Sequence, residues 1–186
     1  MFYERQSKFV IIKPMNNPAK NKGFTIVELL VVITILLILG SIILPSLGDT
    51  RASAALTKAE AQVDQLLNAL TNLSGDTLQY SGHFAAFTAD TGAGGNEVWD
   101  LNAQAAGLTD TDGLFSNWQG PYISTVPLDP WGNPYFFDPD YDIAAIIGTT
   151  SPFYGVVVGS FGPNGAGQNV FDSDNIVEIL YFPGQE

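Results

Sequence analysis

The most apolar stretch of this 186-residue chain is NKGFTIVELLVVITILLILGSIILPSLGD, residues 21–49. It contains one charged side chain away from its two ends, Glu28. As a helix, residues 24–48 would span roughly 37 Å, which is enough to cross a hydrocarbon core of roughly 30 Å. The stretch therefore predicts a transmembrane helix that carries a carboxylate near its start.

The carboxylate of Glu28 needs an explanation, because a charge at the centre of a bilayer costs a few kcal/mol. One explanation is that Glu28 lies shallow enough for its side chain to reach the lipid headgroups. The other is that Glu28 has a specific buried partner. The residues alone leave both explanations open.

Charge is distributed unevenly on the two sides of this stretch. Residues 1–23 carry five basic and one acidic side chain, whereas residues 24–186 carry two basic and eighteen acidic ones. Lys and Arg near a membrane segment stay in the cytoplasm, so we expect a cytoplasmic N-terminus and an exported globular domain over residues 49–186. A cleaved secretory signal is the alternative, but the apolar run is long and Pro45–Gly48 is a poor cleavage site.

Composition argues against an enzyme. The chain has no cysteine and one histidine, His83, which removes cysteine nucleophiles and sites built from His or Cys ligands. The sequence contains neither a G-x-S-x-G motif nor a phosphate-binding loop. The strongly acidic exported part would be repelled by nucleic acid, so we expect no nucleic-acid partner.

After the apolar run, a helical pattern continues for about six turns, with apolar residues spaced i, i+3, i+4. These residues are Ala52, Ala55, Leu56, Ala59, Val63, Leu66, Leu67, Leu70 and Leu73. Ser74-Gly75 is typical of a helix end. The pattern predicts one helix of about fifty residues, apolar all round in its first half and amphipathic in its second.

The remaining elements are shorter. Residues 96–107 predict a short helix, and residues 134–137, 153–161 and 175–182 predict strands, because they are rich in β-branched and aromatic residues. The fold class is therefore α+β, with the amphipathic half of the long helix packed on a small antiparallel sheet. The acidic segments 110–113 and 138–143 are interpreted as turns, since the second lacks the glycine and glutamate of an EF-hand loop.

The segment DPWGNPY, residues 129–135, is interpreted as structural. Its prolines fix φ, Gly132 permits a positive φ, and Trp131 and Tyr135 can bury a large area. A ligand site lined by these aromatic rings is the alternative.

The segment KGFTIVELLVVITILLIL resembles the N-terminal signal of type IV pilins and type II secretion pseudopilins. In that superfamily a basic leader ends in glycine, a hydrophobic residue follows, and a glutamate lies five residues beyond the cut. Gly23, Phe24 and Glu28 match this pattern. Two further segments resemble parts of the major pseudopilins. The first is PYISTVPLDPWGNPYFFDPDYD, and the second is GSFGPNGAGQNVFDSDNI, which resembles their calcium-binding loop.

The resemblance implies processing and assembly. A prepilin peptidase would remove the leader, residues 1–23, and the new N-terminus at Phe24 would be methylated. The α-amino group of Phe24 in one subunit would pair with Glu28 of a neighbour, because two charges about 4 Å apart in a poorly solvated place attract by several kcal/mol. A misplaced subunit would leave both charges unpaired.

The resemblance also implies calcium as a cofactor. Its ligands would be Asp172, Asp174, Asn164 and a backbone carbonyl near Phe161, because calcium takes six to eight oxygens from flexible loops. The family usually has Asp where this chain has Asn164, so we expect weaker binding. A solvated acidic turn is the alternative.

The function implied is a structural subunit of a type II secretion pseudopilus. Expected partners are other pseudopilin subunits in a homopolymer, the peptidase and the inner-membrane secretion platform. The protein would first be anchored by a single pass in the inner membrane and would then form a short periplasmic filament that pushes exported proteins outward. The alternatives are a type IV pilin or minor pilin of a surface fibre, and a membrane-anchored periplasmic domain that does not polymerise.

Overall fold

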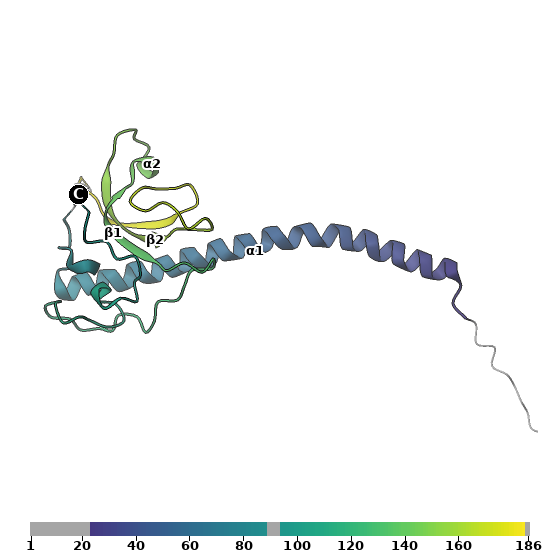
Figure 1. The fold of residues 1–186 in the computed structure, drawn as a ribbon, viewed down its shortest axis with the longest axis horizontal. Coiled ribbons are helices and arrows are strands. Elements are labelled where there is room, and N and C mark those ends of the chain that lie inside the picture. Colours follow the sequence, from purple (N-terminus) through teal and green to yellow (C-terminus); the bar gives the residue numbers. More distant parts are fainter. Residues whose placement is uncertain (1–22, 89–93, 185–186) are drawn as a thin grey trace, which may run out of the picture. The chain divides into compact units, whose positions relative to one another are not determined.

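The computed structural model describes residues 23–88 and 94–184, without the side chains of residues 42–49. The chain forms two compact units, Met1–Ser46 and Leu47–Glu186. Figure 1 shows the elements coloured along the sequence. Residues 1–22 of the leader expected at residues 1–23 lie outside the described residues, and the expected domain boundaries at residues 23 and 48 stay predictions.

Helix α1 runs from Ile26 to Thr77 and contains 52 residues, which confirms the prediction of one helix of about fifty residues. In the first unit its large apolar side chains are exposed on every side; Leu37, for example, is 72% exposed. Among the residues that the structure describes, no helix is both long enough and apolar enough to cross a membrane.

In the second unit, the amphipathic stripe of α1 is buried from Ala59 onward, as its spacing predicts, whereas Ala52 and Leu56 at its start are exposed. Val63, Leu66, Leu70 and Leu73 are fully buried and belong to one apolar cluster with residues of the sheet. The helix ends two residues beyond the predicted Ser74-Gly75 stop. At that end the Thr77 hydroxyl donates to the carbonyl of Leu73 and accepts the N–H of Gln79.

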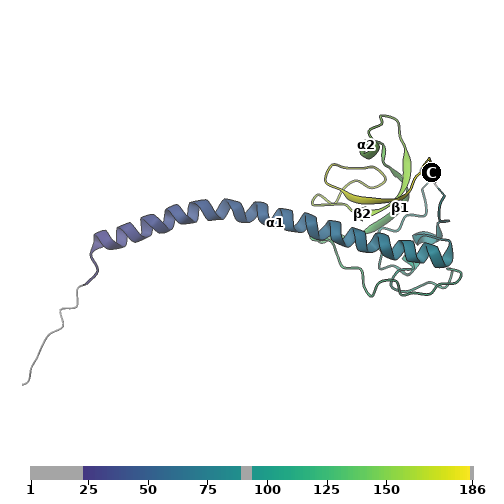
Figure 2. The same cartoon turned by 180° about the vertical axis from the view of Figure 1, so that it is seen from behind.

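The sheet has three antiparallel strands in the order β1–β2–β3 (Figure 2). They are β1 (Phe136–Asp142), β2 (Tyr154–Ser160) and β3 (Ile176–Tyr181). Short helical segments complete the unit: η1 (Ser81–His83), η2 (Gln104–Ala106) and α2 (Ala144–Ile147). These elements confirm the α+β class and the strands predicted at 153–161 and 175–182, whereas β1 shares only Phe136 and Phe137 with the strand predicted at 134–137.

The sheet is buried on both faces, and α1 covers one of them. Phe137, Val156 and Val158 point to the cluster that contains α1. Phe136 and Val157, one residue out of phase, form a second cluster on the opposite face. This alternation follows from the period of two along a strand.

Two local predictions were wrong. Residues 96–107 form a helix only at η2, because Val98 instead pairs with Phe137 of β1 through two backbone hydrogen bonds of 2.8 Å. Residues 138–143 are not a turn, since Asp138 to Asp142 continue β1. A bulge between Asp138 and Tyr141 accommodates Pro139, which has no N–H to give to the ladder.

Candidate functional site

The start of α1 places Glu28 in a local hydrogen-bond arrangement. Oε2 of Glu28 accepts the backbone N–H of Thr25 at 2.8 Å and its hydroxyl at 2.9 Å. In return, the Thr25 hydroxyl oxygen accepts the backbone N–H of Glu28 at 3.2 Å. This is a capping box, which satisfies N–H groups that have no partner inside the helix.

The capping box was missed in the sequence, although its signature T-x-x-E stands directly before the apolar run. It gives Glu28 a structural role besides the two explanations considered above. Both bonds use Oε2, so Oε1 stays available for a group outside the helix. The pairing of Glu28 with the Phe24 amine of another subunit stays a prediction.

Gly23 and Phe24 precede α1 in an open position. Phe24 is 86% exposed. A Cβ atom built on Gly23 would have no atom within 4 Å, so the fold does not require glycine there. A requirement for glycine at this position would therefore come from an external protein that handles the bond between Gly23 and Phe24.

The loop between β2 and β3 brings together Asn164, Asp172 and Asp174, as the sequence predicted. The side-chain amide of Asn164 donates to Oδ2 of Asp172 at 2.9 Å and to Oδ1 of Asp174 at 2.7 Å. The backbone N–H of Asn164 donates to Oδ2 of Asp174 at 3.1 Å. Phe161, at the start of the loop, is buried and stacks on Phe136 with 4.2 Å between ring centroids.

The donor set of this loop fits calcium poorly. The two carboxylates meet at one point, but Asn164 presents hydrogen-bond donors there, while its Oδ1 accepts the N–H of Ala166. Within residues 23–88 and 94–184, no three His, Cys, Asp or Glu side chains could together hold a metal ion. Calcium binding by this chain stays a prediction.

The start of the loop, next to β2, is fastened by further side chains. Asn133 donates to the carbonyl of Gly162 at 3.1 Å, and Ser160 donates to Asp129 at 2.6 Å. Asp129 also accepts the N–H groups of Trp131 and Asn133, which shapes the turn after it. Since Tyr135 is buried and donates to Gln62 of α1, the DPWGNPY segment has the structural role predicted for it.

A second acidic group lies in β1, in a segment whose composition predicts a turn and therefore hides it. Asp138 is fully buried and Asp140 is 5% exposed. Oδ2 of Asp138 and Oδ1 of Asp140 have no hydrogen-bond partner in the described part of the chain. Burial, followed by the nearby Asp140 carboxylate, raises the pKa of Asp138 to about 8, so this carboxyl keeps its proton at neutral pH.

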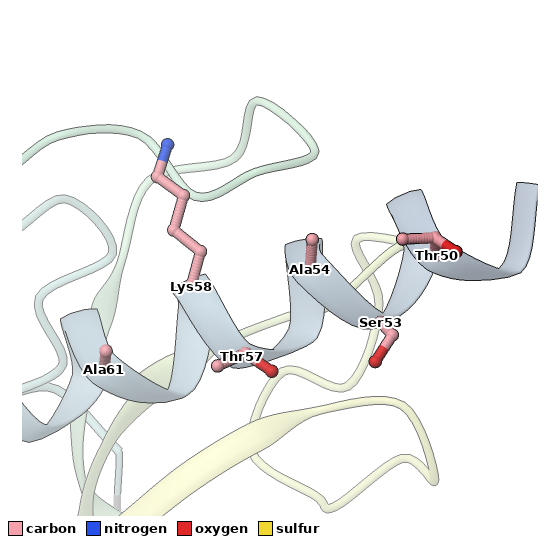
Figure 3. A pocket seen from close by; sticks show the side chains of 6 residues that line it. All are labelled: Thr50, Ser53, Ala54, Thr57, Lys58 and Ala61. Carbon is pink, nitrogen blue, oxygen red and sulfur yellow. The ribbon is translucent and has the colours of Figure 1, made fainter. Parts of the chain in front are cut away.

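One exposed face of α1 forms a shallow hollow (Figure 3). Small side chains and one cation line it: Thr50, Ser53, Ala54, Thr57, Lys58 and Ala61. Figure 3 shows the Lys58 side chain extending away from the helix. All six residues come from a single helix, so this hollow is a helix surface and not a built ligand site.

Comparisons with known proteins agree on one family. A model of the prokaryotic N-terminal methylation motif matches residues 18–44, and a model of type II secretion system protein G matches residues 101–147. Type II secretion system core protein G of Aeromonas hydrophila is 34% identical over 116 residues, 62% of this chain and 71% of the relative. The protein of the same name from Pseudomonas aeruginosa is 28% identical over 160 residues, 84% of this chain and 95% of the relative. No solved structure matches the chain.

Proposed function

The chain belongs to the type II secretion system protein G family, and on this premise we propose how it acts in secretion. It is a major pseudopilin, a structural subunit of the type II secretion pseudopilus. The observation that supports its route to the filament is the start of α1, where an open Gly23-Phe24 bond precedes a helix with exposed apolar side chains on every side.

The proposed route begins in the inner membrane. The basic leader keeps the N-terminus in the cytoplasm, and the apolar part of α1 anchors the protein with its acidic domain in the periplasm. A prepilin peptidase then cuts after Gly23. The same apolar helix surface leaves the lipid when subunits pack against each other, because neighbouring helices can bury it equally well. The resulting short periplasmic filament pushes exported proteins through the outer membrane.

In the filament, we infer that Glu28 sets the register between subunits. Its Oε2 holds the capping box, and its Oε1 can accept a hydrogen bond from the Phe24 α-amine of a neighbouring subunit. A pair of opposite charges in a poorly solvated interface attracts strongly, whereas a subunit placed one step out of register leaves both charges without a partner.

Glu28→Gln tests this role, because glutamine retains the capping box and removes only the charge. We expect insertion and cleavage to be normal and the yield of sheared filaments to fall at least about tenfold, the factor that corresponds to roughly 1.4 kcal/mol. Glu28→Ala should show the same loss, and Glu28→Asp a partial one, because its shorter side chain reaches the amine poorly.

Thr25→Ala is the matched control, since it removes the hydroxyl of the capping box and leaves the carboxylate of Glu28 in place. Its filament yield should stay close to that of the wild type. If Thr25→Ala lowers the yield as much as Glu28→Gln does, Glu28 acts through the helix start and not through a neighbouring subunit. Wild-type yield from Glu28→Gln would contradict the register role outright.

A further inference from the structure

The loop between β2 and β3, residues 161–175, is closed at its centre by one side-chain amide. The Nδ2 atom of Asn164 lies between the carboxylates of Asp172 and Asp174 and donates to both. A cation held by these two carboxylates would bind at the same point. We propose that the Asn164 amide takes the place of this cation, so that the loop of this pseudopilin closes without calcium.

The orientation of the amide is set by the backbone. Oδ1 of Asn164 accepts the N–H of Ala166 at 2.6 Å, which leaves both hydrogens of Nδ2 to the carboxylates. If the amide turned so that Oδ1 faced a cation, Nδ2 would point at the N–H of Ala166. Two donors would then face each other, and the hydrogen bond from Ala166 would be given up to water, because Asn164 and Ala166 are both exposed. Calcium therefore competes with hydrogen bonds that are already formed.

The rest of the loop is also held by amides. Asn175 is 7% exposed, and its Oδ1 accepts the hydroxyl of Tyr141 and the N–H of Asp172, each at 2.8 Å. Its Nδ2 donates to the carbonyl of Ala166 at 2.7 Å. Asn133 donates a hydrogen bond to the carbonyl of Gly162 at the start of the loop. Amide side chains therefore hold the loop at its start (Asn133), its centre (Asn164) and its end (Asn175).

These donors also stabilise the charges that a cation would otherwise neutralise. The hydrogen bond from the Asn164 side chain is the main reason that the pKa of Asp172 lies below its ordinary value. An aspartate at position 164 would destabilise these carboxylate charges instead of stabilising them. One of its oxygens could still accept the N–H of Ala166, but the other would bring a third negative charge to Asp172 and Asp174. Such a loop would need a cation to close.

The experiment compares thermal unfolding of the full-length wild type and Asn164→Asp in detergent, with millimolar calcium and with chelator. We expect the wild-type Tm to differ by less than about 2 °C between the two conditions. For Asn164→Asp we expect calcium to raise the Tm by roughly 5 °C or more, from a value in chelator below that of the wild type. Calcium titration of the wild type by calorimetry provides a second, independent measurement.

Asn164→Ala is the control for the bridge itself, because it removes the amide without adding charge. Its Tm should fall below that of the wild type both with and without calcium. A wild-type Tm that rises in calcium as far as that of Asn164→Asp, or micromolar calcium binding by the wild type, would overturn the proposal. Filament assembly does not enter these measurements, so their outcome is separate from that of the Glu28 variants.

Discussion

Gly23→Val is expected to leave the entire population of the protein as uncut precursor. A valine at this position places a branched side chain next to the Gly23-Phe24 bond, where it obstructs the access of the peptidase. The fold would not change, because a Cβ atom on Gly23 has no atom within 4 Å. Intact-mass measurement of the membrane-bound protein distinguishes the precursor from a mature chain that begins at Phe24.

Gly75→Val is a suitable control for Gly23→Val. Gly75 also has no atom within 4 Å of an added Cβ, and it lies in α1 far along the chain from the cleavage site. This variant should be cut as efficiently as the wild type. A mature N-terminus at Phe24 in Gly23→Val would show that glycine is not required. An N-terminus beyond Leu47 in the wild type would rule out the retained anchor itself.

The fold could be predicted where one physical pattern dominates. The long helix followed from an apolar run and an amphipathic stripe, and the burial of Leu66, Leu70 and Leu73 confirms the stripe. The strands followed from their β-branched and aromatic residues. The secondary structure of short segments was harder to predict, because pairing with a distant strand can override the local helix preference of a segment. Val98 lies in a segment with helical capping signals, yet its backbone pairs with Phe137 of β1.

The candidate sites were predictable to different degrees. Asn164, Asp172 and Asp174 were expected to meet, and they do, but only the structure shows that Asn164 donates to both carboxylates. The direction of an amide depends on its neighbours, here the N–H of Ala166, and no sequence pattern encodes it. The capping box of Glu28 is encoded locally, as T-x-x-E at residues 25–28, so this part of the site can be predicted from the sequence.

The Asp138–Asp140 pair was hidden for a different reason. Asp-Pro-Asp is a typical turn composition, because proline lacks the N–H that a central strand needs. In this protein a bulge places Pro139 within β1, so both aspartates remain in a buried strand. The N–H of Gly94 donates to Oδ2 of Asp140, and the N–H of Asp140 donates to Oδ1 of Asp138. The two remaining oxygens can be satisfied by one shared proton.

This shared proton makes the stability of the protein fall as pH rises. In the unfolded chain Asp138 loses its proton near pH 4, whereas burial and the Asp140 carboxylate hold the pKa of Asp138 at about 8 in the folded state. Between these values the folded state binds one proton more than the unfolded state. The free energy of unfolding should therefore decrease as the pH rises from about 4 towards about 8, and this dependence should end above that range.

Asp138→Asn removes this dependence, because an amide does not titrate in this range and its N–H can donate permanently to Oδ1 of Asp140. Glu97, Asp140 and Tyr141 also face Asp138, and none of them carries a positive charge that could replace the proton. We expect the variant to be more stable than the wild type at pH 9 and to lose this advantage towards pH 5, as measured by urea unfolding at each pH. Asp64→Asn makes the same change of charge on the exposed side of α1, so its stability should follow the wild-type curve. If the curves of Asp138→Asn and wild type run parallel from pH 5 to pH 9, Asp138 is ionised in the folded protein and the shared proton does not exist.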